Sequence, residues 1–144
     1  MKKIVILIFL MCFSISAEAN TQITESNKRA AIASFLSEMS ECAVFYNIVS
    51  QGTDSNGNQW QGGKKFKKLS ENISMMSFNL AKQINMKTET LLAMMTDYAK
   101  EMGNQINHDA INIRILTNKH GEFCKKLAEN PEDRLLFWMS KESR

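Results

Sequence analysis

The sequence predicts an all-α fold: a single small bundle of four to five helices with one long-range disulfide. Apolar residues recur every three or four positions in several long segments, which is the spacing of one helical face. No segment alternates apolar and polar residues as a half-buried strand would. Cys42 and Cys124 are the two cysteines left once a predicted signal peptide is removed, and they supply the expected covalent link.

The first 19 residues have the organisation of a cleaved signal peptide. Two lysines come directly after the initial methionine, an unbroken apolar run follows, and Ala17-Glu18-Ala19 supplies the small residues that signal peptidase recognises. The run is shorter than the roughly 20 residues that span a bilayer, and an uncleaved anchor is the alternative. We expect a signal peptide at 1–19, a helical domain at 20–144, and a protein that is periplasmic or secreted.

The charge and length of the chain after residue 19 indicate which kinds of protein it can be. Residues 1–19 hold two of the 18 basic and one of the 15 acidic side chains, so the mature chain carries a net charge of about +2. This charge is too small to indicate nucleic-acid binding. The length suits one domain with its own core. No second apolar run is long enough for a membrane span, so we expect none in the mature chain.

The segment from about Ala30 to Ser50 is the predicted centre of the bundle. Its apolar residues step by three and four along one face, with Cys42 in the middle of that stripe. The stripe widens in the second half, which suggests contact with two neighbouring helices. Glu38, Ser40 and Glu41 fall on the opposite, polar face. We therefore expect this first helix to carry the bundle on its apolar side.

The apolar spacing in the middle of the chain predicts further helices, which follow a glycine-rich loop at 51–63. A second helix is expected at about 64–86. Residues 88–129 form either one long kinked helix or two helices. We prefer two, because Gly103-Asn104 interrupts the pattern and a mid-helix glycine costs about 1 kcal/mol relative to alanine. Gly121 counts against the later segment for the same reason.

The first and the last predicted helix each begin with residues that are typical of a helix N-terminus. Thr24 or Ser26 could cap the first helix by accepting hydrogen bonds from free backbone N–H groups. In Asn130-Pro131, asparagine can cap and proline fits the first helical position. We therefore expect a short final helix from there to about Lys141, packed across the bundle.

The cysteine pair is most simply a disulfide, since an exported chain meets an oxidising environment. Closing such a long loop stabilises by about 4–5 kcal/mol in the chain-entropy model. A free pair and a metal site are the alternatives. His120 lies four residues before Cys124 and shares its helix face, so with Cys42 it could form a metal site or a thiol–imidazole pair. The disulfide leaves His120 at the edge of the bundle.

We predict that the protein is a non-enzymatic protein-binding module, and we name an inhibitor or immunity-type protein as its subtype. Its partner would be an unidentified protein of the cell envelope. The expected contact surface is the 51–68 segment, with an aromatic anchor and a basic rim. The partner-binding residues of this surface are Trp60, Lys64, Lys65, Lys67 and Lys68.

The alternative is a carrier or sensor of a small apolar ligand or metal that uses a methionine-rich interior. Eight of the 10 methionines follow the signal peptide, and thioethers suit both soft Cu(I) and irregular apolar cores. The Asp54–Asn58 stretch resembles the opening of a calcium loop, but Gln59 and Lys65 occupy positions that need glycine and glutamate. No catalytic set is evident, so we expect no enzyme, no cofactor and no bound metal.

Overall fold

The computed structural model describes residues 24–52 and 62–144. Within them the chain forms five α-helices and one short 3₁₀ helix, with no strand. The α-helices are α1 (Glu25–Ser50), α2 (Gly63–Gln83), α3 (Thr88–Gln105), α4 (Ile113–Glu129) and α5 (Pro131–Glu142); the 3₁₀ helix is η1 (Ala110–Asn112). The predicted all-α bundle is confirmed. The predicted signal peptide at 1–19 and the predicted anchor Trp60 lie outside the described residues.

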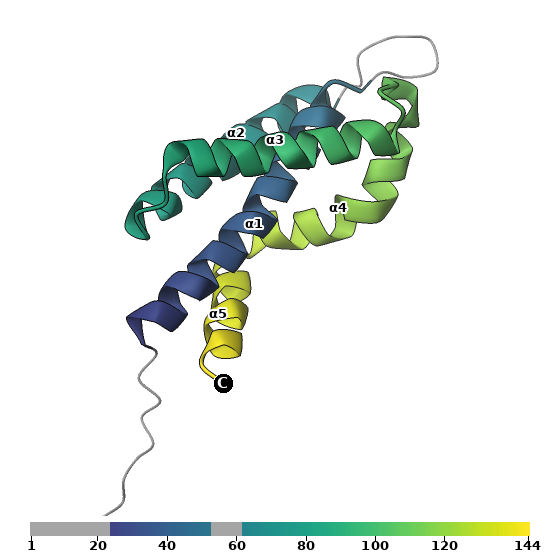
Figure 1. The fold of residues 1–144 in the computed structure, drawn as a ribbon. Helices are drawn as coiled ribbons and strands as arrows, with labels where there is room; N and C mark the ends of the chain where they lie inside the picture. Colours follow the sequence, from purple (N-terminus) through teal and green to yellow (C-terminus); the bar gives the residue numbers. More distant parts are fainter. Residues whose placement is uncertain (1–23, 53–61) are drawn as a thin grey trace, which may run out of the picture.

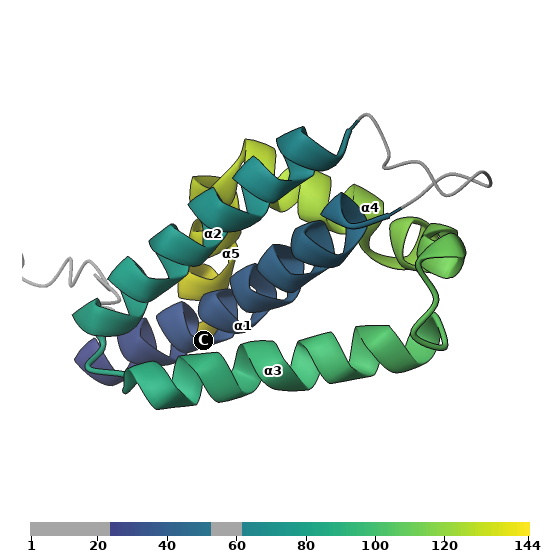
Figure 2. The same cartoon turned by 90° about the horizontal axis from the view of Figure 1, so that it is seen from above.

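The other four α-helices surround α1 (Figure 1). Seen from above, α2 and α3 run along the two sides of α1 (Figure 2). The last two helices divide its length: α4 packs against the second half, and α5 packs against the first half, around Ile32 and Leu36. The predicted central position of the first helix is therefore correct, but it contacts four neighbours instead of two.

Local sequence explains where most of the helices begin and end. Thr24 caps α1, because its side-chain oxygen accepts a hydrogen bond from the N–H of Asn27. Pro131 opens α5 as predicted, but Asn130 makes no capping hydrogen bond through its side chain. The second helix ends at Gln83, earlier than expected, because Asn85 adopts a left-handed φ of 55° that starts the turn into α3.

The region 88–129 forms two helices, as preferred. The break comes after Gln105, where Asn107 and His108 adopt φ values of 53° and 55°. Gly103 makes room for the turn: a Cβ there would lie 3.1 Å from the His108 ring. The prediction that the helix is interrupted near Gly103 is therefore confirmed, although the residues with left-handed φ values that turn the chain come a few positions later.

A disulfide joins the middle of α1 to α4, as predicted. Cys42 and Cys124 are separated by 82 residues in sequence, and both are fully buried in the larger apolar cluster. Such a bond is compatible with an oxidising compartment outside the cytoplasm. Within the described ranges, no helix combines the length and apolar character that crossing a membrane requires.

The polar face of α1 is covered by other helices over part of its length. Ser40 is fully buried, and Glu38 and Glu41 are half-buried. The reason is that α4 and α5 cover this face and bring polar partners to it: Arg134 binds Glu38, and His120 binds Glu41. The first helix is therefore enclosed on its polar side as well as on its apolar side.

Candidate functional site

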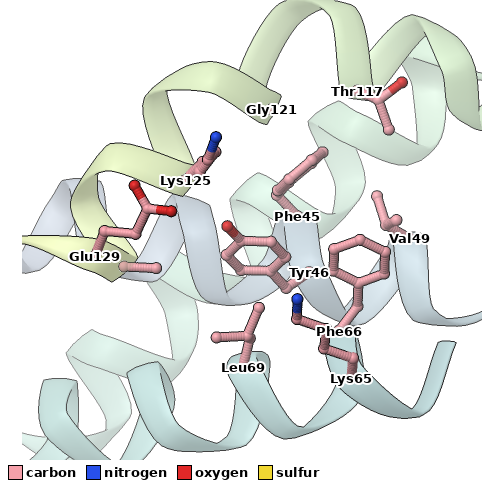
Figure 3. Close-up of a pocket in the computed structure, with 11 residues that line it drawn as sticks. Phe45, Tyr46, Val49, Lys65, Phe66, Leu69, Thr117, Gly121, Lys125 and Glu129 are labelled. Atoms are coloured by element: carbon pink, nitrogen blue, oxygen red, sulfur yellow. The ribbon is translucent and has the colours of Figure 1, made fainter. Parts of the chain in front are cut away.

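A cleft with an aromatic floor lies between α1, α2 and α4, and we call it the aromatic cleft (Figure 3). Its volume is about 500 Å³, within the range of known ligand sites. Three helices supply the lining residues: Phe45, Tyr46 and Val49 from α1; Lys65, Phe66 and Leu69 from α2; Thr117, Gly121, Lys125, Ala128 and Glu129 from α4. It is therefore built from segments far apart in the sequence.

The floor of the aromatic cleft consists of packed aromatic rings. Tyr46 of α1 stacks on Phe66 of α2, with ring centroids 5.7 Å apart and planes 12° from parallel. Phe45 lies 5.1 Å from the Tyr46 ring in a tilted arrangement. Stacked and tilted aromatic pairs hold each other in place beyond the gain from burial. A ligand side chain that enters the cleft would meet a preformed surface.

The rim of the aromatic cleft is charged and mainly positive. Lys65 reaches it from α2 and Lys125 from α4, with Glu129 one turn beyond Lys125 (Figure 3). None of these three forms an ion pair with any described residue. Within the part of the chain that the structure describes, the two ammonium groups therefore have no ion-pair partner.

Tyr46 contributes a hydroxyl to this apolar site. Burial raises the pKa of Tyr46 above its usual value, and the nearby Glu129 carboxylate raises it further. Both effects disfavour the phenolate, so the hydroxyl stays protonated and can donate a hydrogen bond across the physiological pH range. The site therefore combines apolar surface, two cations and one neutral donor.

The aromatic cleft includes one of the five residues predicted for partner binding. Lys65 lines it, whereas Lys64, Lys67 and Lys68 are exposed on the same turns of α2 and do not line it. Phe66 points inward between the lysines and packs on the core. Trp60 is outside the described residues, so its predicted role stays a prediction.

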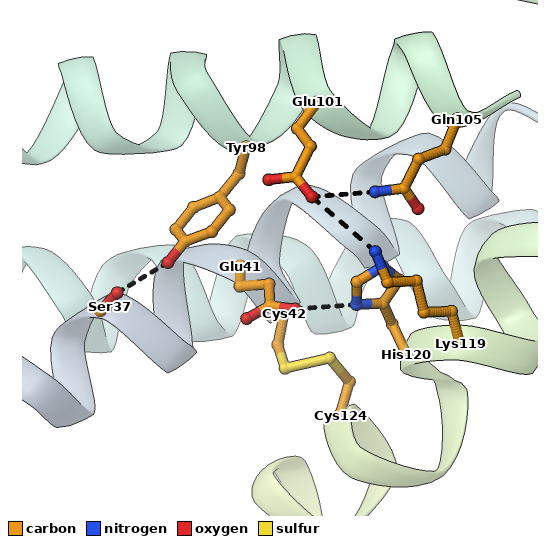
Figure 4. Close-up of polar contacts among 9 residues, drawn as sticks. All are labelled: Ser37, Glu41, Cys42, Tyr98, Glu101, Gln105, Lys119, His120 and Cys124. Carbon is orange, nitrogen blue, oxygen red and sulfur yellow. Dashed lines mark hydrogen bonds and ion pairs between the residues drawn. A yellow bond between two sulfur atoms is a disulfide. The ribbon is translucent and has the colours of Figure 1, made fainter. Parts of the chain in front are cut away.

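A second group of polar contacts lies beside the disulfide, between α1, α3 and α4 (Figure 4). The His120 Nδ1 atom is 2.8 Å from the Glu41 Oε1 atom, and Ser37 Oγ is 2.7 Å from Tyr98 Oη. Gln105 Nε2 donates a 3.0 Å hydrogen bond to Glu101. The first two contacts tie α1 to α4 and to α3, whereas the third lies within α3.

The thiol–imidazole site considered from the sequence does not form. Both sulfurs are in the disulfide, and His120 is only 7% exposed, so its expected position at the edge of the bundle was wrong. The His120 Nε2 atom is buried with no hydrogen-bond partner among the described residues. His108 lies elsewhere, exposed in the α3–η1 turn, where it contacts Asn104. The structure therefore does not bring the two histidines together.

The methionines do not form one cluster. Met39 and Met102 are fully buried in the core, whereas Met75 is 61% exposed. Met75 and Met95 line a wide groove of about 720 Å³ between α2 and α3, with α1 below. Among the described residues, no group of three or more His, Cys, Asp or Glu side chains is placed to hold a metal ion.

Sequence reasoning missed most residues of the aromatic cleft. Phe45 and Tyr46 are buried core residues, only 2% and 4% exposed, that also line the cleft. Lys125 carried no local signal. Gly121 did carry one, since a glycine inside a helical pattern needs a reason. Comparisons of the chain with protein-family models, with curated proteins and with solved structures found no match.

Proposed function

We propose that this chain is an exported, non-enzymatic protein-binding module that holds a segment of its partner in the aromatic cleft. One observation carries the proposal: an apolar, preformed cleft of about 500 Å³ has two lysines on its rim that no described residue neutralises. Binding sites commonly join apolar walls to a few convergent polar groups. Interfaces similarly place aromatic anchors within a polar rim.

The charges of the cleft indicate the partner's character. Lys65 and Lys125 approach from opposite walls, and only Glu129 opposes them. A carboxylate placed between two ammonium groups gains charge-assisted hydrogen bonds. The exposed neighbours Lys64 and Lys68 add to the positive field, which favours encounter with an acidic surface. The partner would thus be an acidic protein of the cell envelope.

An inhibitor or immunity-type role is the sharper form of this proposal. It requires that the partner be an envelope hydrolase or toxin whose activity falls when the complex forms. The alternative function, a carrier of a small apolar ligand or metal, makes a different demand, because such a ligand would remain bound when the protein is isolated. Both functions can be separated in one experiment.

The experiment is native mass spectrometry on full-length tagged protein recovered gently from its own cell envelope without reductant. Wild type is compared with a Lys65→Glu, Lys125→Glu double variant and with Lys100→Glu. Lys100 is exposed on α3 and does not line the aromatic cleft, so this variant is the control for reversing a charge outside the cleft. Circular dichroism on each purified variant checks that it is folded.

We expect one protein to accompany wild type and Lys100→Glu but to be lost from the double variant. Reversing both charges should weaken the complex by about tenfold or more, which corresponds to roughly 1.4 kcal/mol. Recovery of the same partner with the double variant would contradict the proposed site. Wild type that carries a lipid or metal and no protein would favour the carrier, and wild type that carries nothing would contradict the binding function.

A further inference from the structure

Gly121 is a glycine that the fold itself does not require. It lies in the interior of α4, where glycine costs about 1 kcal/mol relative to alanine. A Cβ built at this position would meet only the Phe45 ring, at 4.0 Å, which is ordinary van der Waals contact. Its backbone has no left-handed φ that would demand glycine. An alanine would therefore fit and would stabilise the helix.

At three other glycines, the packing of a neighbouring side chain explains why the residue is glycine. A Cβ at Gly52 would lie 2.9 Å from Ile113 Cδ1, one at Gly62 would lie 3.0 Å from the Phe66 ring, and one at Gly103 would lie 3.1 Å from His108. At each of these sites a neighbouring side chain occupies the space. At Gly121 the space is open and belongs to the aromatic cleft.

Gly121 lies in the middle of the α4 residues that line the aromatic cleft. Thr117, Gly121 and Lys125 occupy successive turns of α4 and form its stripe along the cleft. Gly121 lies on α4 beside Phe45 (Figure 3), and it is partly exposed, so no side chain of its own covers the main chain there. Glycine is the usual residue where a ligand must approach a backbone closely.

We infer that Gly121 admits a large apolar side chain of an acidic partner segment, which lies on the Phe45 and Tyr46 rings against the bare turn of α4. The neighbouring carboxylate of that segment pairs with Lys65 and Lys125. This inference rests on the proposed function and names the chemistry that the site recognises. The occupant is a segment of an acidic protein, because Lys65 and Lys125 on the rim attract carboxylates and the cleft is only partly enclosed.

The test uses synthetic peptides of twelve residues and full-length protein. The first peptide has one central tryptophan flanked by glutamates, the second has lysines in place of the glutamates, and the third has alanine in place of the tryptophan. The protein variants are Gly121→Ala, Gly121→Leu and Asn118→Ala. Asn118 is exposed on α4 and does not line the cleft, so its change to alanine also favours the helix but leaves the cleft open.

We expect the first peptide to bind wild type and Asn118→Ala alike and to bind at least about tenfold more tightly than the other two peptides. Gly121→Ala should raise Tm by about 3–5 °C while weakening the first peptide by about tenfold. Gly121→Leu should abolish its binding. A gain in stability together with a loss of binding is a result that a merely structural glycine would not give.

Three outcomes would overturn the inference. Gly121→Ala could lower Tm, which would mean that the glycine serves internal packing. It could raise Tm and leave peptide binding unchanged, which would mean that the ligand does not reach α4. Wild type could bind no peptide, or bind only dodecanoate added as a lipid probe, and the occupant would then not be an acidic segment. In each case, an envelope partner lost on Lys65→Glu, Lys125→Glu would still support the proposed function.

Discussion

The charged groups around α1 fall into two regions that the fold treats in opposite ways. On the polar side of α1, Glu38 binds both Arg134 and the Trp138 indole N–H, and Glu41 binds His120. At the aromatic cleft, Lys65 and Lys125 have no ion-pair partner among the described residues. The first set of charges holds helices together, and the second set forms no such contact within residues 24–52 and 62–144.

A single helix separates the two regions. His120 and Gly121 are neighbours on α4, yet His120 faces Glu41 and the disulfide, whereas Gly121 faces the aromatic cleft. One wall of the candidate site is therefore positioned by contacts on its opposite side. Perturbing the paired charges should affect stability, and perturbing the unpaired ones should affect binding.

The largest effect should follow from removing the disulfide that fixes α4 to α1. A Cys42→Ala, Cys124→Ala double variant should lose about 4–5 kcal/mol in its free energy of unfolding, because the bond closes a loop spanning 82 residues. Urea unfolding of wild type and variant measures this loss. Adding reductant should destabilise wild type and leave the double variant unchanged; a loss below about 1 kcal/mol would contradict the prediction.

The next effect tests the paired region. Glu38→Ala should cost about 2 kcal/mol, because it leaves the partly buried Arg134 guanidinium and the Trp138 indole without their acceptor. The control is Glu25→Ala, which removes only an exposed pair with Arg29 and should cost less than about 0.5 kcal/mol. Equal losses in urea unfolding for the two variants would mean that the Glu38 contacts do not hold α5 to α1.

A smaller effect tests the unpaired region. Lys65→Ala and Lys125→Ala should each change the free energy of unfolding by less than about 0.5 kcal/mol, because neither ammonium group forms an ion pair with a described residue. Thermal unfolding followed by circular dichroism is sufficient. A loss comparable with that of Glu38→Ala would show that these lysines serve the fold and would remove the contrast between the two regions.

The smallest effect concerns pH. Because the pKa of Tyr46 is raised in the folded protein, the folded state retains a proton that the unfolded state has lost once pH exceeds about 10. The stabilising contribution of this tyrosine is therefore complete below that pH and is lost as pH rises toward the folded pKa.

Absorbance at 295 nm can follow this titration, since the chain has only two tyrosines. In a Tyr98→Phe background, the phenolate signal of Tyr46 should have a midpoint above 10, and Glu129→Gln should lower that midpoint. A midpoint at or below 10 would mean that Tyr46 is exposed to solvent, which would contradict the buried floor of the aromatic cleft.

Much of the fold could be predicted because its signals are local. Apolar spacing marks each helix, Thr24 caps α1, Pro131 opens α5, and the two cysteines that follow the predicted signal peptide have one obvious pairing. The contacts of Glu38 and Glu41 could not be predicted, because they depend on which helices meet. Glu38 and Arg134 are 96 residues apart, and nothing near either residue identifies the other.

The candidate site was only partly predictable for a related reason. Lys65 was named because it lies in a basic run, but Lys125 and Glu129 reach the cleft from α4, and no sequence pattern joins them to α2. Gly121 was visible in the sequence as a defect in a helix. Its meaning depends on the open space beside it, which only the packing of α1, α2 and α4 defines.

The position of α1 has a consequence for how the chain is made. This helix is synthesised before the other four, yet its covering is completed by α5, which is synthesised last among them. Until then its wide apolar surface has no full set of neighbours, so early segments cannot finish folding on their own. Contacts between distant parts of a chain also form slowly. A nascent chain of this design therefore completes the packing around its first helix only after its last helix has been synthesised.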